Sequence, residues 1–210
     1  MSAILARLRA ETRAAHEAIE RDLDWERRVA TRAGYRTLLE RFYGFHAVFE
    51  PAVAAALADD ALHAPRRKLG LLAQDLGFHG LSPAAVAALP RPRRLRLPAT
   101  RPEALGALYV TEGSTLGGQL IARHVERHLG LGEAGSRYHR SYGREVGAMW
   151  AGFRRRLDEA ATADPDCAAA IVEGANRTFA DLGAWLCGDP AASALLPRHE
   201  PAAGLDRLPE

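Results

Sequence analysis

Four polar side chains near the start of the chain form one continuous stripe in which a histidine could bind a metal. Arg9, Arg13, His16 and Glu20 follow one another at steps of four, three and four residues, and such steps place side chains on one side of an α-helix. Glu20 is positioned to accept the Nδ1 proton of His16 and to leave Nε2 free to bind a metal. The competing interpretation is a histidine at the edge of the core with no ligand.

The charges around His16 indicate which metal group would suit it. A bare metal ion prefers several carboxylates or histidines, and the sequence has no H-E-x-x-H motif and no paired E-x-x-H motifs. A single neutral imidazole flanked by cations fits an iron porphyrin, because the arginines can bind its two carboxylates. We therefore predict that His16 is an iron ligand beside Arg9 and Arg13.

A second unusual stretch is the predicted helix from Glu103 to Leu129. Thr100 and Glu103 have the spacing of a capping box, and a glycine follows Leu129. Its interior nevertheless contains three glycines, which are Gly113, Gly117 and Gly118. Each costs about 1 kcal/mol of helix stability relative to alanine. The sequence thus predicts a contact that requires a bare backbone.

Two explanations of this bare backbone stay open. Gly113 and Gly117 are four residues apart and share one face, against which a flat ligand could lie. A close crossing with another helix is the alternative, and for the glycines taken alone it is the more common case. Phosphate-binding loops are excluded, because GSTLGG lacks their lysine and no G-x-G-x-x-G follows a strand.

The remaining segments predict a single all-α domain, a bundle of about seven helices over residues 1–188, with an irregular, proline-rich tail at 189–210. β-Branched residues are scarce and nothing alternates, so no strand is predicted. Pro51 should kink or break the second helix near Glu50. The expected helices cover residues 3–22, 31–57, 65–76, 82–89, 103–129, 142–160 and 164–187.

Composition limits the class of protein further. The 210 residues carry a formal net charge of +2, and no run is long and apolar enough to span a membrane. Cys167 and Cys187 lack CxxC spacing, which favours a reducing cytoplasm and structural thiols. The arginines between Arg91 and Arg101 are interpreted as a solvated loop, with an acidic partner as the alternative.

Four segments of the chain resemble the heme oxygenases, and the bacterial, biliverdin-producing members most closely. Their order and spacing match from about residue 4 to residue 188. The segments are LRAETRAAHEAIE around His16, ERFYGFHAVFEP, the glycine segment YVTEGSTLGGQLIARHV, and YGREVGAMWAGFRRRL. The glycine segment is the most specific of them.

This resemblance implies a role for several residues in an all-helical bundle that holds heme between a proximal and a distal helix. His16 corresponds to the proximal iron ligand and Glu20 to its hydrogen-bond partner. Catalytic positions on the distal side are Gly113, Ser114 and Gly117. The other heme-binding positions are Arg9, Arg13, Tyr109, Gly118, Phe153 and Arg154. Mammalian members have an aspartate where this chain has Ser114, so the residues that order distal water differ.

The resemblance also implies an activity, that of a cytoplasmic oxidoreductase of heme degradation. Such an enzyme opens heme to biliverdin with O2 and electrons and releases CO and ferrous iron, so that heme is both substrate and cofactor. Its partners would be heme and an electron donor such as a ferredoxin or reductase, with no nucleic acid and no membrane.

Two other classes of function stay open from the sequence. A heme store or sensor would need His16 and the arginines, but no oxygen-activating distal face. A cofactor-free helical bundle that only binds other proteins would need neither.

Overall fold

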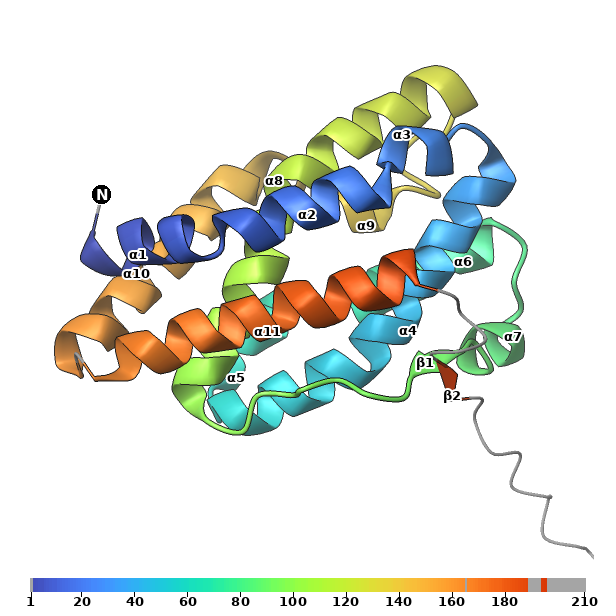
Figure 1. Cartoon of the computed structure of the whole chain (residues 1–210). Coiled ribbons are helices and arrows are strands. Elements are labelled where there is room, and N and C mark those ends of the chain that lie inside the picture. Colours follow the sequence, from blue (N-terminus) through green and yellow to red (C-terminus); the bar gives the residue numbers. More distant parts are fainter. Residues whose placement is uncertain (1, 165, 189–193, 196–210) are drawn as a thin grey trace, which may run out of the picture.

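The computed structural model describes residues 2–164, 166–188 and 194–195. It is a bundle of helices in which α8 bends as it passes through the middle and α11 packs across it (Figure 1). The first half comprises α1 (Ala3–Glu11), α2 (Arg13–Leu23), α3 (Trp25–Arg28), α4 (Arg32–Leu57), α5 (Asp60–His63), the 3-10 helix η1 (Ala64–Arg66), α6 (Leu69–Phe78) and α7 (Pro83–Ala87). The second half comprises α8 (Arg101–Leu129), α9 (Arg137–Arg140), the 3-10 helix η2 (Gly143–Glu145), α10 (Val146–Ala163) and α11 (Cys167–Cys187).

The predicted all-α class is therefore confirmed. The capping box is also confirmed, because the Thr100 side chain accepts from the Glu103 amide while the Glu103 carboxylate accepts from the Thr100 amide. Gly130 ends α8 in the left-handed conformation, at φ 63°. The sequence thus determined both ends of the helix that carries the glycines.

The closest helix crossing in the bundle joins α8 to α11, and it depends on two buried glycines. A Cβ atom on Gly106 of α8 would overlap the carbonyl oxygen of Ile171, and one on Gly174 of α11 would overlap that of Glu103. Each helix therefore lies directly against the backbone of the other. This crossing uses glycines other than the three that the sequence singled out.

The expected first helix over residues 3–22 is wrong in one respect, since it is divided at Thr12. The buried Thr12 hydroxyl donates to the Leu8 carbonyl at 2.8 Å, a side-chain bond that bends helices. Ile4 and Leu8 bury α1 in the core, whereas α2 has no buried residue. α2 instead rests on α11, where Ile19 lies against Gly183.

Pro51 does not break α4, which continues through it from Arg32 to Leu57. Thr31 caps this helix by accepting from the Gly34 amide. Pro51 lies on an exposed side of α4, where water can bind the carbonyl group that a proline leaves without a donor. The exposed position explains why the helix survives.

The third expected helix, over residues 65–76, is also divided, and α6 begins only at Leu69. The cause lies elsewhere in the chain. The buried carboxylate of Glu50 on α4 accepts from the amides of Lys68 at 2.6 Å and Leu69 at 3.0 Å. A carboxylate from another helix therefore caps α6, which a local pattern cannot predict.

A carboxylate from another helix also caps α9, which lies between the expected helices over residues 103–129 and 142–160. Asp75 on α6 is fully buried, and its two oxygens accept from the amides of Arg137 at 2.9 Å and Tyr138 at 2.8 Å. Burial raises the pKa of Asp75, while these two hydrogen bonds oppose the rise.

The expectation of no strand is corrected by a two-residue pairing. β1 (Arg91–Pro92) pairs antiparallel with β2 (Ala194–Leu195). β2 falls within the expected irregular tail, of which residues 189–193 and 196–210 lie outside the described residues. Within the described part of the chain, the structure contains no helix capable of spanning a membrane.

The crossing of α8 and α11 predicts a large effect of a single methyl group. We expect Gly106→Ala to lower the melting temperature, because its Cβ would meet backbone that cannot rotate away. Overpacking of this kind costs about 1–3 kcal/mol or more. Gly152→Ala on α10 is the control, since its Cβ would meet only the Arg155 guanidinium at 3.8 Å. Equal melting temperatures for the two variants would contradict the close crossing.

Candidate functional site

His16 lies on an exposed part of α2 with its ring accessible to a ligand. Its side chain is 53% exposed, and its Nδ1 atom is 3.5 Å from Oε2 of Glu20, one turn later. The ring stands edge-on to Phe179 of α11, with the centroids 5.6 Å apart. The arrangement holds the ring between a carboxylate and an aromatic side chain and leaves Nε2 available as a metal ligand.

The middle of α8 presents an unusual exposed face, made of Gly113, Leu116, Gly117 and Leu120. We call it the glycine face. Leu116 and Gly117 follow Gly113 by three and four residues, and Leu120 follows Leu116 and Gly117 by four and three, so all four share one side of the helix. Leu116 is 46% exposed and Leu120 is 52% exposed. Two neighbouring exposed leucines beside bare backbone form an apolar surface suited to contact with a ligand.

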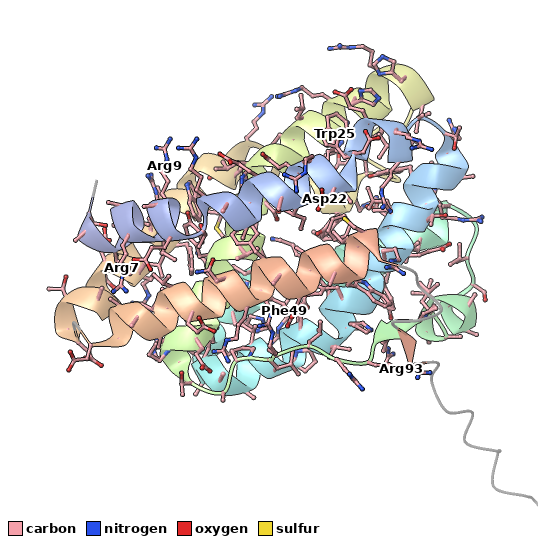
Figure 2. All side chains as sticks on the ribbon, in the orientation of Figure 1. Arg7, Arg9, Asp22, Trp25, Phe49 and Arg93 are labelled. Carbon is pink, nitrogen blue, oxygen red and sulfur yellow. The ribbon has the colours of Figure 1, made fainter. Side chains whose placement is uncertain are left out.

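Contacts at two places fix how α2 lies along α8. At the first, the side chain of Thr12, directly before α2, forms a hydrogen bond with Tyr109 of α8. This bond opposes the rise in the pKa of Tyr109 that burial causes. At the second, the ring of Trp25, just after α2, meets the ring of His124 at 5.2 Å between centroids. Figure 2 shows Trp25 at the junction of α3 and the second half of α8. Thr12 precedes Trp25 and Tyr109 precedes His124, so α2 and α8 run in the same direction.

These contacts place His16 level with the glycine face. His16 follows Thr12 by four residues, and Gly113 follows Tyr109 by four residues. Four residues cover about 6 Å of helix axis in each case. The predicted iron ligand and the first of the predicted distal glycines therefore lie at the same height along the two helices.

The surroundings of the glycines separate the two explanations of the bare backbone. A Cβ on Gly117 would meet nothing within 4 Å, and one on Gly113 would meet only the Trp150 ring at 3.9 Å. Within residues 2–164 and 166–188, no backbone of another helix lies within 4 Å of these two Cβ positions. Gly118 differs, because its Cβ would lie 2.9 Å from the carbonyl oxygen of His139 on α9. The helix-crossing explanation holds for Gly118, whereas Gly113 and Gly117 face open space.

Three hydroxyl side chains weaken the helix around the first glycine. Ser114 donates to the Thr111 carbonyl at 2.8 Å, and Thr115 donates to the Glu112 carbonyl at 2.6 Å. Thr111 donates in turn to the Leu108 carbonyl at 3.3 Å. Such bonds compete with the backbone ladder and bend helices. Together with the glycines they account for the bend of α8.

Basic and aromatic side chains gather at one end of the glycine face. The guanidinium of Arg154 lies 5.8 Å from the centroid of the Trp150 ring, and that ring is 5.7 Å from Tyr109. Burial raises the pKa of Tyr109, and the charge of Arg9 opposes that rise; Figure 2 shows the Arg9 side chain extending outward from α1. Arg9 therefore lies near Tyr109, and Arg154 lies near its neighbour Trp150.

The other candidate arginines have carboxylate partners. Arg13 pairs with Glu17 at 2.7 Å in an exposed position, where its hydrogen bond lowers the pKa of Glu17. Arg156 binds Asp59 and Glu159, both at 3.3 Å. Between Arg154 and Arg156, the geometry therefore favours Arg154 for a ligand at the glycine face.

Comparison with known proteins agrees with this arrangement. The sequence model of the heme oxygenase family matches residues 2–186. The chain belongs to the heme oxygenase family. No curated protein sequence matches the chain.

Two solved heme oxygenases share the fold. One is the NO- and CO-bound heme oxygenase from Neisseria meningitidis, with a TM-score of 0.68 and 23% identity, over 92% of this chain and 98% of that one. The other is heme oxygenase 2 from Chlamydomonas reinhardtii without heme, with a TM-score of 0.67 and 17% identity, over 87% and 95%.

Two residues that the resemblance to heme oxygenases proposed for heme binding are placed elsewhere. Phe153 is fully buried, stacked beneath Trp150 at 6.1 Å between centroids. Gly118 is also buried and packs on α9. Both positions are at odds with direct contact at an exposed face. Trp150 is the aromatic residue of α10 that borders Gly113, with its ring 3.9 Å from the position of a Cβ there.

Sequence reasoning also missed four residues of the site. Leu116 and Leu120 lie on the same helix face as Gly113 and Gly117. Their spacing alone does not tell whether that face is buried or exposed. Trp150 and Phe179 approach from other helices and gave no local signal. Of the residues that the sequence predicted, the structure pairs His16 with Glu20, and it gathers Arg9, Gly113 and Arg154 around Tyr109 and Trp150.

The two kinds of glycine predict opposite effects on the ligand-free protein. Gly117→Ala should raise the free energy of unfolding by up to about 1 kcal/mol, because alanine favours helix and the space is open. Gly118→Ala should lower it by about 1–3 kcal/mol, since the methyl group would press on α9. Chemical denaturation of both variants tests this. A destabilised Gly117→Ala would show that the glycine face is packed after all.

Proposed function

We propose that this protein is a heme oxygenase that binds heme between His16 of α2 and the glycine face of α8 and opens it to biliverdin. O2 and electrons are consumed, and CO and ferrous iron are released. The supporting observation is the glycine face itself, which is bare and apolar and lies level with an exposed histidine. Family membership supports the same activity.

The residues present fit heme. A flat apolar macrocycle would cover the exposed Leu116 and Leu120, and burial of apolar surface contributes about 25 cal/mol per Å². Its two carboxylates would meet arginines at the end where Arg9 lies near Tyr109 and Arg154 lies near Trp150. Among the described residues, no group of three or more His, Cys, Asp or Glu side chains is placed to hold a metal ion. A single ligand is what an iron porphyrin requires.

When bound, heme would supply the redox chemistry and the macrocycle that is opened. The protein supplies position and exclusion. His16 Nε2 would bind the iron while Glu20 holds the Nδ1 proton and orients the ring. Gly113 and Gly117 place no side chain where O2 must sit. Arg9, Arg13 and Arg154 would fix the rotation of heme in its plane and so select the carbon that is attacked.

Ser114 directly follows the first distal glycine, Gly113, on α8. Its hydroxyl proton is donated to the Thr111 carbonyl at 2.8 Å, so its oxygen is left to accept a hydrogen bond from water. We propose that it orders distal water in this way. A ferredoxin or a reductase would deliver the electrons, in the cytoplasm.

One experiment separates this proposal from the alternatives. Hemin is titrated into the protein, and O2 and a reductant are then added. We expect a Soret band, followed by its loss and a product absorbing in the red. A heme store or sensor would give the Soret band without the product, and a protein-interaction module would give no sharp band. Either result would refute the proposed activity.

The ligand assignment is tested by replacing His16. We expect His16→Ala to lose the axial imidazole signature of the ferric protein and most verdin formation, and added imidazole to restore part of both. His128→Ala is the control, because that residue is exposed at the far end of α8. Unchanged spectra in His16→Ala would assign the iron to another residue.

The arginine assignment predicts a change in product more than in affinity. We expect Arg154→Ala to shift the ratio of verdin isomers, because heme can then rotate in its plane. The free energy of hemin binding should weaken by about 1.5–3 kcal/mol if a charge-assisted hydrogen bond is lost, and by less if the arginine and the heme carboxylate are solvated. Arg156→Ala is the matched control, since Arg156 is bound to Asp59 and Glu159. Identical isomer ratios and affinities for Arg154→Ala and wild type would remove Arg154 from the site.

A further inference from the structure

A group of charged side chains is buried beside the glycine face. Glu112, which directly precedes Gly113, is 1% exposed. Its Oε1 accepts from the Tyr142 hydroxyl at 2.6 Å, and its Oε2 lies 3.2 Å from Nε of Arg66. Lys68 is 3% exposed, with Nζ 3.9 Å from Glu112 Oε1 and 3.5 Å from the centroid of the Tyr142 ring. We call these four residues the Glu112 cluster.

The Glu112 cluster ties α8 to three other parts of the chain. Arg66 is in η1, Lys68 immediately precedes α6, and Tyr142 immediately precedes η2. Burial raises the pKa of Glu112, whereas Lys68, Tyr142 and Arg66 oppose the rise. Burial likewise lowers the pKa of Lys68 to about 8, against the charges of Glu112 and Glu50. Each buried charge therefore depends on its partners, and the contact resists separation.

A second polar contact holds the same side of α8 two turns later. Gln119 donates through Nε2 to the carbonyl oxygens of His139 at 3.3 Å and Arg140 at 2.8 Å. Glu112 and Gln119 are seven residues apart, so they lie on one face of the helix. They bracket the segment that contains all three glycines and two of the three hydroxyl groups that weaken it, those of Ser114 and Thr115. A soft segment is thus fixed at both ends from one side.

We propose that Glu112 is the positioning residue of the glycine face: its buried contacts hold α8 so that Gly113 and Gly117 present their bare backbone toward His16. The proposal rests on the proposed function. Glu112 acts through the helix and touches no ligand. Gln119 holds only the C-terminal end of the segment, because the glycines between it and Glu112 allow the helix to bend there.

Hydrogen exchange of the ligand-free protein tests the positioning without any activity. We expect Glu112→Gln to speed amide exchange several-fold in residues 109–120, because the amide leaves Arg66 without its buried counter-charge and leaves Lys68 with that of Glu50 alone. Exchange in α11 should not change. Glu126→Gln is the matched control on the same helix, since Glu126 pairs with Arg140 at 2.9 Å in a partly exposed position.

The holoprotein gives the second readout. Glu112→Gln should bind hemin through His16 with wild-type affinity and spectrum, but shift the verdin isomer ratio and lower the turnover number. Unchanged exchange in residues 109–120 together with an unchanged isomer ratio would overturn the proposal. Faster exchange throughout the protein would also overturn it, because Glu112 would then serve general stability alone.

Two further arms keep the test decisive. If Glu112→Gln does not fold, Tyr142→Phe is used, since it removes only the 2.6 Å hydrogen bond to Glu112. It should give a smaller increase in exchange in residues 109–120. No increase there would contradict the proposal. If the wild-type protein forms no verdin, the proposed function fails. Exchange in residues 109–120 still decides whether Glu112 positions α8.

Discussion

The close crossing of α8 and α11 determines the geometry of the whole molecule. Gly106 and Gly174 let the two backbones touch, and α11 also carries α2 through Gly183 and Phe179. The distance between α2 and α8 is therefore set by a third helix on which both rest. A space for a ligand can persist in a tightly packed bundle only if the walls are supported from behind. α11 provides that support, and the site needs no direct packing of one wall on the other.

Much of the fold followed from local signals, because these report on backbone hydrogen bonding within a few residues. The capping box at Thr100 gave a correct helix start, and the helix expected from residue 31 begins where Thr31 caps α4. The errors at α6 and α9 share a cause. α6 and α9 begin where Glu50 and Asp75 accept their first amide hydrogens, and both carboxylates come from other helices. No window of sequence around Leu69 or Arg137 contains that information.

The candidate site shows the same limit in a different form. His16 and Glu20 were recognisable because both belong to one helix and interact at a fixed spacing. The glycines of α8 were recognisable as a group, but their individual roles were not. Gly113 and Gly117 face open space, whereas Gly118 packs on α9, and only the positions of neighbouring helices distinguish them. Glu112 gave no signal at all, since its partners come from three other parts of the chain.

The break at Thr12 has a consequence for the life of the protein in a cell. α1 is buried in the core, whereas α2 beyond the break has no buried residue and rests on α11 from one side. A helix with so little burial opens locally at a small free-energy cost, well below that of global unfolding. A ligand bound through His16 would close α2 onto the bundle and stabilise it by mass action. The empty protein would then be cut by proteases first at α2, and the supply of ligand would set how long each molecule survives.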